Sequence, residues 1–385
     1  MILTALAARA VGRPVKLVLT RPEMFTGVGH RPRSVQTIRM GARRDGELVA
    51  IEHVSTNSAA IAHASIEPIA GATARSYAYA NVVTTDRQRR LNIPLPGSMR
   101  GPGHAQGNFA LESSIDELAY ELGLDPLELR LRNYAEVHPQ SGLPWSSNAL
   151  RECYAIGAER FGWTGRNPEI GSMRDGHWKI GYGLAAISWS WFQVRCRVRA
   201  TITRDGQADV RSAASDPGTG TRTVMHQLSS ERLGLPLDHV RFELGDSDMP
   251  WSPAAGGSSL TASLGNAVHA VCAALIQRFL ITVAADDHSP LRGCSLDEVT
   301  AADGRIHRRD DARAGERYTD ILARHGLDEL TADAEATPPT RDVELANSGP
   351  FAAKFVEVHV DEDLGLIRVA RVTTTVDAGR RPDRW

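Results

Sequence analysis

The chain has 385 residues, with 44 basic and 46 acidic side chains and a formal net charge of −2 at pH 7. Hydrophobic residues make up 42% and charged residues 23%, a composition that excludes a wholly disordered chain. The near balance of charge argues against non-specific nucleic-acid binding, which depends on a basic surface, so nucleic acid is not an expected partner.

Two apolar segments, the first residues of the chain and the stretch over 264–285, are considered in turn as a signal peptide and as a membrane-spanning helix. Residues 1–11 carry Arg9 inside a short apolar run without a basic segment before it, so no signal peptide is expected. Residues 264–285 are interrupted by His269, Gln277 and Arg278, which favours a buried helix over a membrane span. We therefore expect no membrane partner.

The spacing of cysteine and histidine residues argues against a metal site or an iron–sulfur cluster within this chain. The four cysteines form no CxxC pair, so an iron–sulfur cluster or structural zinc within this chain is not expected, and unpaired thiols suit a reducing compartment such as the cytoplasm. The 13 histidines form no HExxH motif, so no metal-ligand set is predicted. No serine lies in a GxSxG motif, which disfavours a hydrolase triad.

In chain order, the pattern predicts a helix over 4–11, a strand over 15–19, and a hairpin of 36–40 and 48–53 about Asp45-Gly46. A further strand is expected over 77–85. A Pro/Gly-rich loop over 94–103 precedes a helix, for which Phe109, Ile115, Leu118 and Leu122 are expected to line one side. Asp125-Pro126 marks the start of the next helix.

Residues 164–178 form the best candidate linker, and further strands and helices are expected beyond it. The expected elements are a hairpin of 198–202 and 208–211, a helix over 223–233, a strand over 240–244, a long helix from about 261, a helix over 318–325, and strands over 355–360 and 367–376. We expect an α+β fold of two domains, with mixed sheets and flanking helices.

Two segments share a strand–loop–helix design with a loop of glycines and hydroxyls. They are Gly218-Thr219-Gly220-Thr221 and Gly256-Gly257-Ser258-Ser259, the latter continuing through Leu260 to Thr261-Ala262-Ser263. Glycines allow a ligand close to the backbone, and unpaired N–H groups at a helix start favour an anion, so two such loops suit a large phosphate-bearing cofactor. Two ordinary capped helices are the alternative.

The Pro/Gly-rich loop carries Arg100, whose planar guanidinium suits a carboxylate or a developing oxyanion. A surface arginine in an arginine-rich chain is the alternative. His104 either faces the same pocket or has a structural role. Glu117 and Glu121 are most simply a solvated helix face.

These motifs together resemble the large subunit of the xanthine dehydrogenase/aldehyde oxidase family. The resemblance rests on ordered segments across nearly the whole chain: 99–103, 106–107, 110–119, 124–133, 218–221, 244–248, 256–263, 355–358 and 376–380.

The resemblance implies a molybdenum hydroxylase subunit that binds molybdopterin in its cytosine dinucleotide form and oxidises an aldehyde or N-heterocycle with oxygen derived from water. It implies Arg100 as the catalytic arginine that orients the substrate. It implies a cofactor cleft formed by Met99, Gly101, Gly218, Thr219, Gly220, Thr221, Gly256, Gly257, Ser258, Ser259, Thr261, Ala262 and Ser263. Iron–sulfur clusters and FAD would belong to partner subunits, and the location is the cytoplasm, or the periplasm if a partner carries an export signal.

Two features of the family lie outside the printed sequence: a Gly-Gly-Phe-Gly-Gly-type loop upstream, and a downstream Gly-Glu whose glutamate is the general base. We therefore expect a subunit truncated at both ends, with domains over 1–163 and 178–385, whose general base is absent from this polypeptide. The alternative is a non-catalytic fragment that acts at most as a subunit-docking piece.

Overall fold

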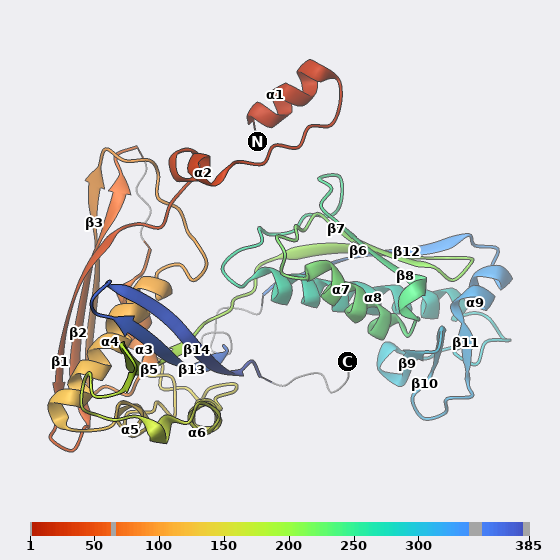
Figure 1. Ribbon diagram of the computed structural model, residues 1–385. Helices are drawn as coiled ribbons and strands as arrows, with labels where there is room; N and C mark the ends of the chain where they lie inside the picture. The colour runs from red at the N-terminus through yellow and green to blue at the C-terminus, as the bar shows by residue number, and fades with distance from the viewer. Residues whose placement is uncertain (1, 63–66, 339–348, 380–385) are drawn as a thin grey trace. The chain divides into compact units, whose positions relative to one another are not determined.

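The computed structural model describes residues 2–62, 67–338 and 349–379, which form two compact units (Figure 1). The first unit combines residues 1–189 with 349–385, and the second comprises residues 190–348. Each unit has its own sheets and its own core.

The first sheet of the first unit begins with the predicted hairpin. β1 (Ser34–Ala42) pairs antiparallel with β2 (Leu48–Ala60) about Gly46, whose φ of +94° suits glycine. β3 (Asn81–Leu91) pairs parallel with β2, later in the chain than the predicted strand over 77–85. Tyr77 is instead a buried core residue that precedes the strand.

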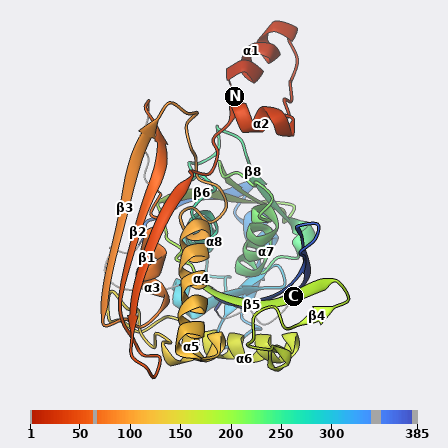
Figure 2. The ribbon, with the colours of Figure 1, turned by 60° about the vertical axis from the view of Figure 1, so that its left-hand side comes forward.

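Helix α4 (His104–Leu122) runs beside this sheet, as Figure 2 shows. It buries Leu111, Ile115 and Ala119, but Phe109 is 76% exposed, so its predicted place on the buried side is wrong. The buried positions follow spacings of four residues from Leu111, whereas Phe109 lies outside that stripe.

The second sheet of the first unit has the order β14-β13-β5-β4. Its antiparallel strands are β4 (Arg174–Asp175), β5 (Trp178–Ser188), β13 (Phe351–Asp361) and β14 (Leu366–Asp377). The remaining helices of this unit are α1 (Ile2–Val11), α2 (Arg21–Gly27), η1 (Ala70–Ala72), α3 (Thr73–Ser76), α5 (Pro126–Arg132), α6 (Leu150–Phe161) and η2 (Trp163–Gly165).

The predicted strand over 15–19 is wrong: these residues lie between α1 and α2 outside any strand pairing. The compact units also divide the chain differently from the domain boundary expected at 164–177, because β13 joins β5 and α6 contacts both β13 and β14. The domains expected over 1–163 and 178–385 remain a prediction, because a compact unit of the structure and a domain defined by sequence similarity are different divisions of a chain.

The second unit is a four-stranded sheet of order β12-β6-β7-β8 backed by two helices (Figure 1). Its strands are β6 (Cys196–Thr203), β7 (Ala208–Ser212), β8 (Val240–Leu244) and β12 (Glu329–Ala336), and its helices are α7 (Thr221–Leu233) and α8 (Leu260–Val283). Burial alternates along β6, where Val198, Ala200 and Ile202 belong to the same core as the apolar face of α8.

A smaller sheet of order β11-β10-β9 completes the second unit. Its elements are η3 (Leu237–His239), η4 (Leu296–Glu298), β9 (Val299–Ala302), β10 (Arg305–Arg308), β11 (Gly315–Arg317) and α9 (Tyr318–Arg324). Helix α8 is long and apolar enough to cross a membrane by length and composition, a property that core helices share. It buries twelve residues, and all of them except Ser263 belong to the unit's hydrophobic core, as the prediction of a buried helix requires.

Candidate cofactor-binding site

The structure brings the two predicted Gly/Ser/Thr loops together within the second unit. They line one cavity of about 300 Å³, a size at the lower end for small-molecule sites. Five of its lining residues were predicted from the sequence: Thr219, Gly256, Ser258, Ser259 and Thr261. Pro217, Ala255 and Leu260 complete the lining.

The first loop differs from the expectation in its backbone donors. The Asp216 carboxylate accepts hydrogen bonds from the N–H groups of Gly218, Thr219 and Gly220 at 2.9–3.2 Å, and from that of Arg222 at 3.2 Å. These bonds lower the pKa of Asp216 below its usual value, so the carboxylate is ionised. The expectation of unpaired N–H groups is therefore wrong for these four groups, at which the chain's own aspartate occupies the place of an external anion.

What the first loop offers a ligand is shape and hydroxyl groups. Gly218 and Gly220 have φ values of +104° and +78°, and a side chain at either position would meet open space. The hydroxyl of Thr219 lies 2.9 Å from that of Thr221. The hydrogen bonds to Asp216 thus hold the loop in a fixed shape, and its two glycines leave space beside the backbone for a ligand.

The second loop enters the 24-residue helix α8 through a tight turn. The Ser259 N–H and hydroxyl both donate to the Gly256 carbonyl, at 3.2 and 2.9 Å. Ser258 has a φ of +59°, which is uncommon for a residue with a side chain, and the Cβ of any residue replacing Gly257 would lie 2.9 Å from the Phe192 ring. The backbone therefore passes the cavity in a shape that larger residues would not adopt without strain.

Ser263, also predicted to contact the cofactor, has its hydroxyl engaged inside the protein. It donates to the Ser259 carbonyl at 2.7 Å and accepts from the Val194 N–H at 2.9 Å. Ser263 is 1% exposed and lies outside the lining of the cavity, as do Gly218, Gly220, Thr221, Gly257 and Ala262. These six residues shape the loops, and their contact with a cofactor remains a prediction.

The donor set and shape of this cavity fit a pterin bearing a phosphate. Thr261 offers an exposed hydroxyl beside the N-terminal turn of α8, where the helix dipole favours negative charge. The Cα of Gly256 faces open space, as a cradle for a flat ring requires. Among the described residues, no group of three or more His, Cys, Asp or Glu side chains is arranged to hold a metal ion.

Arg100 belongs to the first unit, in the loop before α4, and its side chain is exposed. Its backbone is held firmly: Arg31 donates from Nη2 to the Arg100 carbonyl at 2.6 Å and from Nη1 to Gln106 Oε1 at 3.0 Å. No hydrogen bond or ion pair joins the Arg100 guanidinium to the described part of the chain. A fixed backbone with an unengaged cationic side chain suits a ligand-orienting group.

The rest of this loop is fixed against residues 67–69. Glu67 Oε2 accepts from the Gly103 N–H at 3.1 Å and from Gln106 Nε2 at 3.4 Å. Gly103 has a φ of +72°, and a Cβ there would lie 2.6 Å from the Pro68 carbonyl oxygen. Neither Arg31 nor Glu67 was expected from the sequence, because Arg31 lies 69 residues before Arg100 and Glu67 lies 36 residues before Gly103.

The surroundings of His104 match the structural role, which was one of the two roles expected for it. Its ring packs on Trp189 at a centroid distance of 4.4 Å. Burial, assisted by the nearby Arg75 charge, lowers the pKa of His104 to about 4, so the imidazole is neutral at pH 7. Glu117 and Glu121 are exposed on α4, as predicted.

Comparison with known proteins places these loops in a family context. Models described as "Molybdopterin cofactor-binding domain" match residues 1–134 and 157–383. The aldehyde oxidoreductase molybdenum-binding subunit PaoC of Escherichia coli is 35% identical over 380 residues, covering 98% of this chain and 50% of that protein. The xanthine dehydrogenase molybdenum-binding subunit of Escherichia coli O157:H7 is 28% identical, covering 97% and 51%. The chain thus spans about half the length of these relatives.

Two solved structures share the fold. Quinoline 2-oxidoreductase from Pseudomonas putida 86 has a TM-score of 0.79 at 18% identity, covering 96% of this chain and 50% of that one. The aldehyde oxidoreductase of Desulfovibrio desulfuricans has a TM-score of 0.74 at 22% identity, covering 97% and 40%. Both confirm the expected α+β architecture.

Proposed function

Because the chain belongs to the molybdopterin cofactor-binding domain family, we propose that it forms the cofactor-binding part of a hydroxylase that oxidises an aldehyde or an N-heterocycle. The observation that carries the proposal is the shared cavity of the two loops in the second unit. The 35% identity to an aldehyde oxidoreductase subunit favours the aldehyde over the heterocycle.

In this proposal the cofactor is molybdopterin in its cytosine dinucleotide form. Thr219, Ser259 and Thr261 supply hydroxyl groups to it, while Gly256 allows it close to the backbone. When bound, the cofactor supplies a two-electron oxidation in which oxygen from water is added to the substrate carbon. The electrons leave through iron–sulfur and FAD partner subunits, and the complex is cytoplasmic unless a partner carries an export signal.

Arg100 orients the substrate in this proposal. Its guanidinium donates to the aldehyde oxygen or a ring acceptor and stabilises negative charge that develops there. Arg31 and Glu67 keep the loop in place, so the backbone that carries Arg100 loses little conformational entropy when substrate binds.

The test uses the full-length subunit that contains this chain, assembled with its partners and supplied with an aromatic aldehyde. Arg100→Ala should lower turnover by ~10²-fold or more, as loss of a charge-stabilising donor does, while molybdenum content stays normal. Arg89→Ala, at an exposed arginine of β3, is the matched control. Unchanged turnover in Arg100→Ala would remove Arg100 from the mechanism.

The alternative, a non-catalytic docking piece, makes a different prediction for the same material. It predicts that the assembled complex contains no molybdenum attributable to this chain, and that loop variants leave the metal content unchanged. Molybdenum content therefore separates the two candidates without an activity assay.

A further inference from the structure

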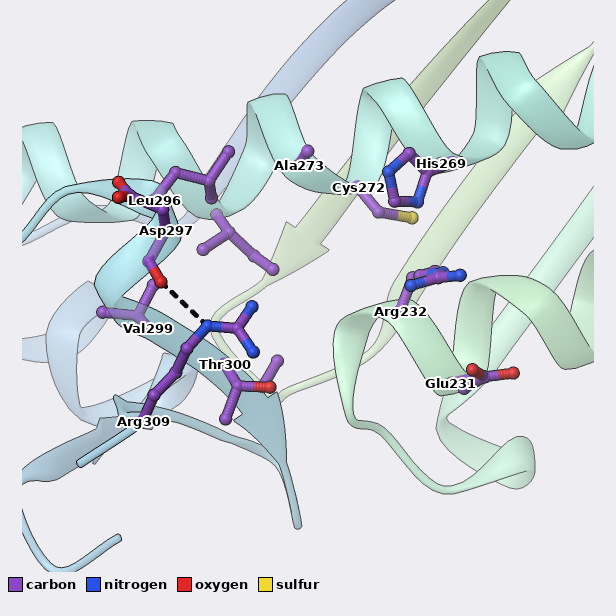
Figure 3. A pocket seen from close by; sticks show the side chains of 12 residues that line it. Glu231, Arg232, His269, Cys272, Ala273, Leu296, Asp297, Val299, Thr300 and Arg309 are labelled. Atoms are coloured by element: carbon purple, nitrogen blue, oxygen red, sulfur yellow. Dashed lines mark hydrogen bonds between the residues drawn. The ribbon is translucent and has the colours of Figure 1, made fainter. Parts of the chain in front are cut away.

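The second unit contains another hollow, larger than the loop cavity and separate from it (Figure 3). Its volume is about 620 Å³, in the middle of the range of small-molecule sites. It shares no lining residue with the loop cavity, which lies at the start of α8. His269 is eight residues beyond Thr261, so the two sites are separated by about 12 Å along the helix axis.

Three elements form its walls. One is the face of α8 that presents His269, Cys272, Ala273 and Ile276, which recur at helical spacing. The end of α7 contributes Arg232, and the segment from η4 to β9 contributes a third wall from Leu296 to Ala301, with Arg309 beside it.

These walls are fixed with respect to one another. Gly234 ends α7 so close to β9 that a Cβ there would lie 2.4 Å from the Ala301 carbonyl carbon. The Gly304 N–H donates to the Gly234 carbonyl at 2.6 Å, and the buried Tyr318 hydroxyl donates to the Leu233 carbonyl at 2.8 Å. The hollow is therefore part of a packed framework of the unit.

Its two arginines lie on opposite sides of the hollow. Figure 3 shows the guanidinium of Arg309 on one side and Arg232, with His269, on the other. Arg309 Nε donates to the Asp297 carbonyl at 2.9 Å, which orients the guanidinium. Within the described ranges, no carboxylate lies at ion-pair distance from Arg232, His269 or Arg309.

The other lining groups restrict what can bind. Ala273, Ile276, Leu296 and Val299 give the hollow an apolar portion. Glu231 and Asp297 also line it, and these two carboxylates would repel a polyanion such as a nucleoside polyphosphate. Arg232 and Arg309 line the hollow from opposite sides, so a carboxylate held between them is attracted from both sides while the apolar portion accommodates its hydrophobic body.

We propose that this hollow is a binding site for a small organic monoanion, namely a carboxylic acid with a compact apolar body. The two arginines pair with the carboxylate, and Ile276 and Leu296 contact the hydrocarbon part. This inference concerns a site apart from the cofactor loops, so it does not depend on the proposed function.

The test is a calorimetric titration of the full chain with benzoate, repeated with benzamide, its neutral analogue. Benzoate should bind with a stoichiometry of one, and benzamide should bind ~10-fold or more weakly, because the charge-assisted bonds are lost. Arg232→Gln and Arg309→Gln should each weaken benzoate ~10-fold or more. Arg292→Gln, at an exposed arginine of the same unit outside the lining, should bind benzoate as the unaltered chain does.

Absence of benzoate binding would overturn the proposal, as would equal binding of benzamide. Unchanged binding in both pocket variants would place the benzoate elsewhere and also overturn it. The benzamide comparison uses the unaltered chain, so the proposal stays testable if a variant does not fold. As a further check, Ala273→Phe adds a ring at a partly exposed position of the wall and should abolish binding.

Discussion

Replacement of the buried Arg130 by methionine should destabilise the first unit severely. Arg130 is fully buried on α5 and uses all five of its N–H donors. They reach Glu112 Oε2 at 3.0 Å, Asp116 Oδ1 at 2.6 Å, and the carbonyls of Pro126, Glu112 and Leu184 at 3.0–3.2 Å. One side chain thus joins α5 to α4 and β5.

The magnitude follows from what Arg130→Met would leave behind. The Glu112 carboxylate, 7% exposed, would keep the Tyr77 hydroxyl at 2.8 Å and the Ala186 N–H at 2.9 Å but lose its cationic partner. Asp116, 28% exposed, can be hydrated in part. Breaking a buried ion pair from one side costs about 3–5 kcal/mol, and the lost carbonyl partners place Arg130→Met at the upper end of this range.

The assay is hydrogen exchange with mass spectrometry across a urea series. Peptides from α4 and α5 report on the first unit, while peptides from α8 report on the second and serve as an internal control. Arg39→Met breaks the exposed pair with Glu52 and should cost less than about 1 kcal/mol. A loss below about 1 kcal/mol in Arg130→Met would show that the bonds of Arg130 contribute little to the stability of the first unit. Arg130→Met combined with Glu112→Met should cost less than the sum of the two single changes.

Three further changes have expected outcomes. Asp125→Ala removes the N-cap of α5 and the acceptor for the Trp163 indole N–H at 3.1 Å, and should lower the free energy of unfolding by about 2 kcal/mol in urea titration. Gly157→Ala places a Cβ 2.4 Å from the Phe355 ring and should cost about 1–2 kcal/mol in the same titration despite its better helix propensity; a gain in stability would contradict the packing described. The depressed pKa of His104 means that the unfolded chain binds a proton between pH 6.5 and about pH 4 that the folded chain does not, so stability should fall as the pH is lowered through this window. His104→Gln should lessen that fall, and an unaltered pH profile of the urea midpoint would count against the assignment.

Local signals in the sequence predicted those elements whose cause is local. Asp45-Gly46 specifies its hairpin because glycine alone adopts the required backbone shape easily, and Asp125 caps its helix through its own side chain at 2.8 Å. By contrast, residues 15–19 have the composition of a strand but pair with no strand among the described residues, and composition alone does not show whether a strand has a partner.

In the candidate site, too, features with a local cause were predicted from the sequence and features that depend on tertiary packing were not. The glycine and hydroxyl pattern identified both loops, and the structure places residues of both around one cavity. The sequence did not reveal that Asp216 would occupy the first loop's N–H groups, since an aspartate two residues before a glycine is also common in plain turns. The larger hollow between α7, α8 and β9 depends on tertiary packing alone and carries no local signal.

Whether the two loops hold the cofactor is tested by the molybdopterin content of the chain after production in a host that makes the cofactor, measured as metal and as the fluorescent oxidised pterin. The chain should carry close to one cofactor, and Gly256→Leu should lose it, because the leucine side chain would extend into open space at the loop cavity without an internal clash. Gly165→Leu, at an exposed glycine of the first unit, should retain the cofactor. Cofactor content that is absent from the unaltered chain, or equal in Gly256→Leu, would contradict the assignment of the loops.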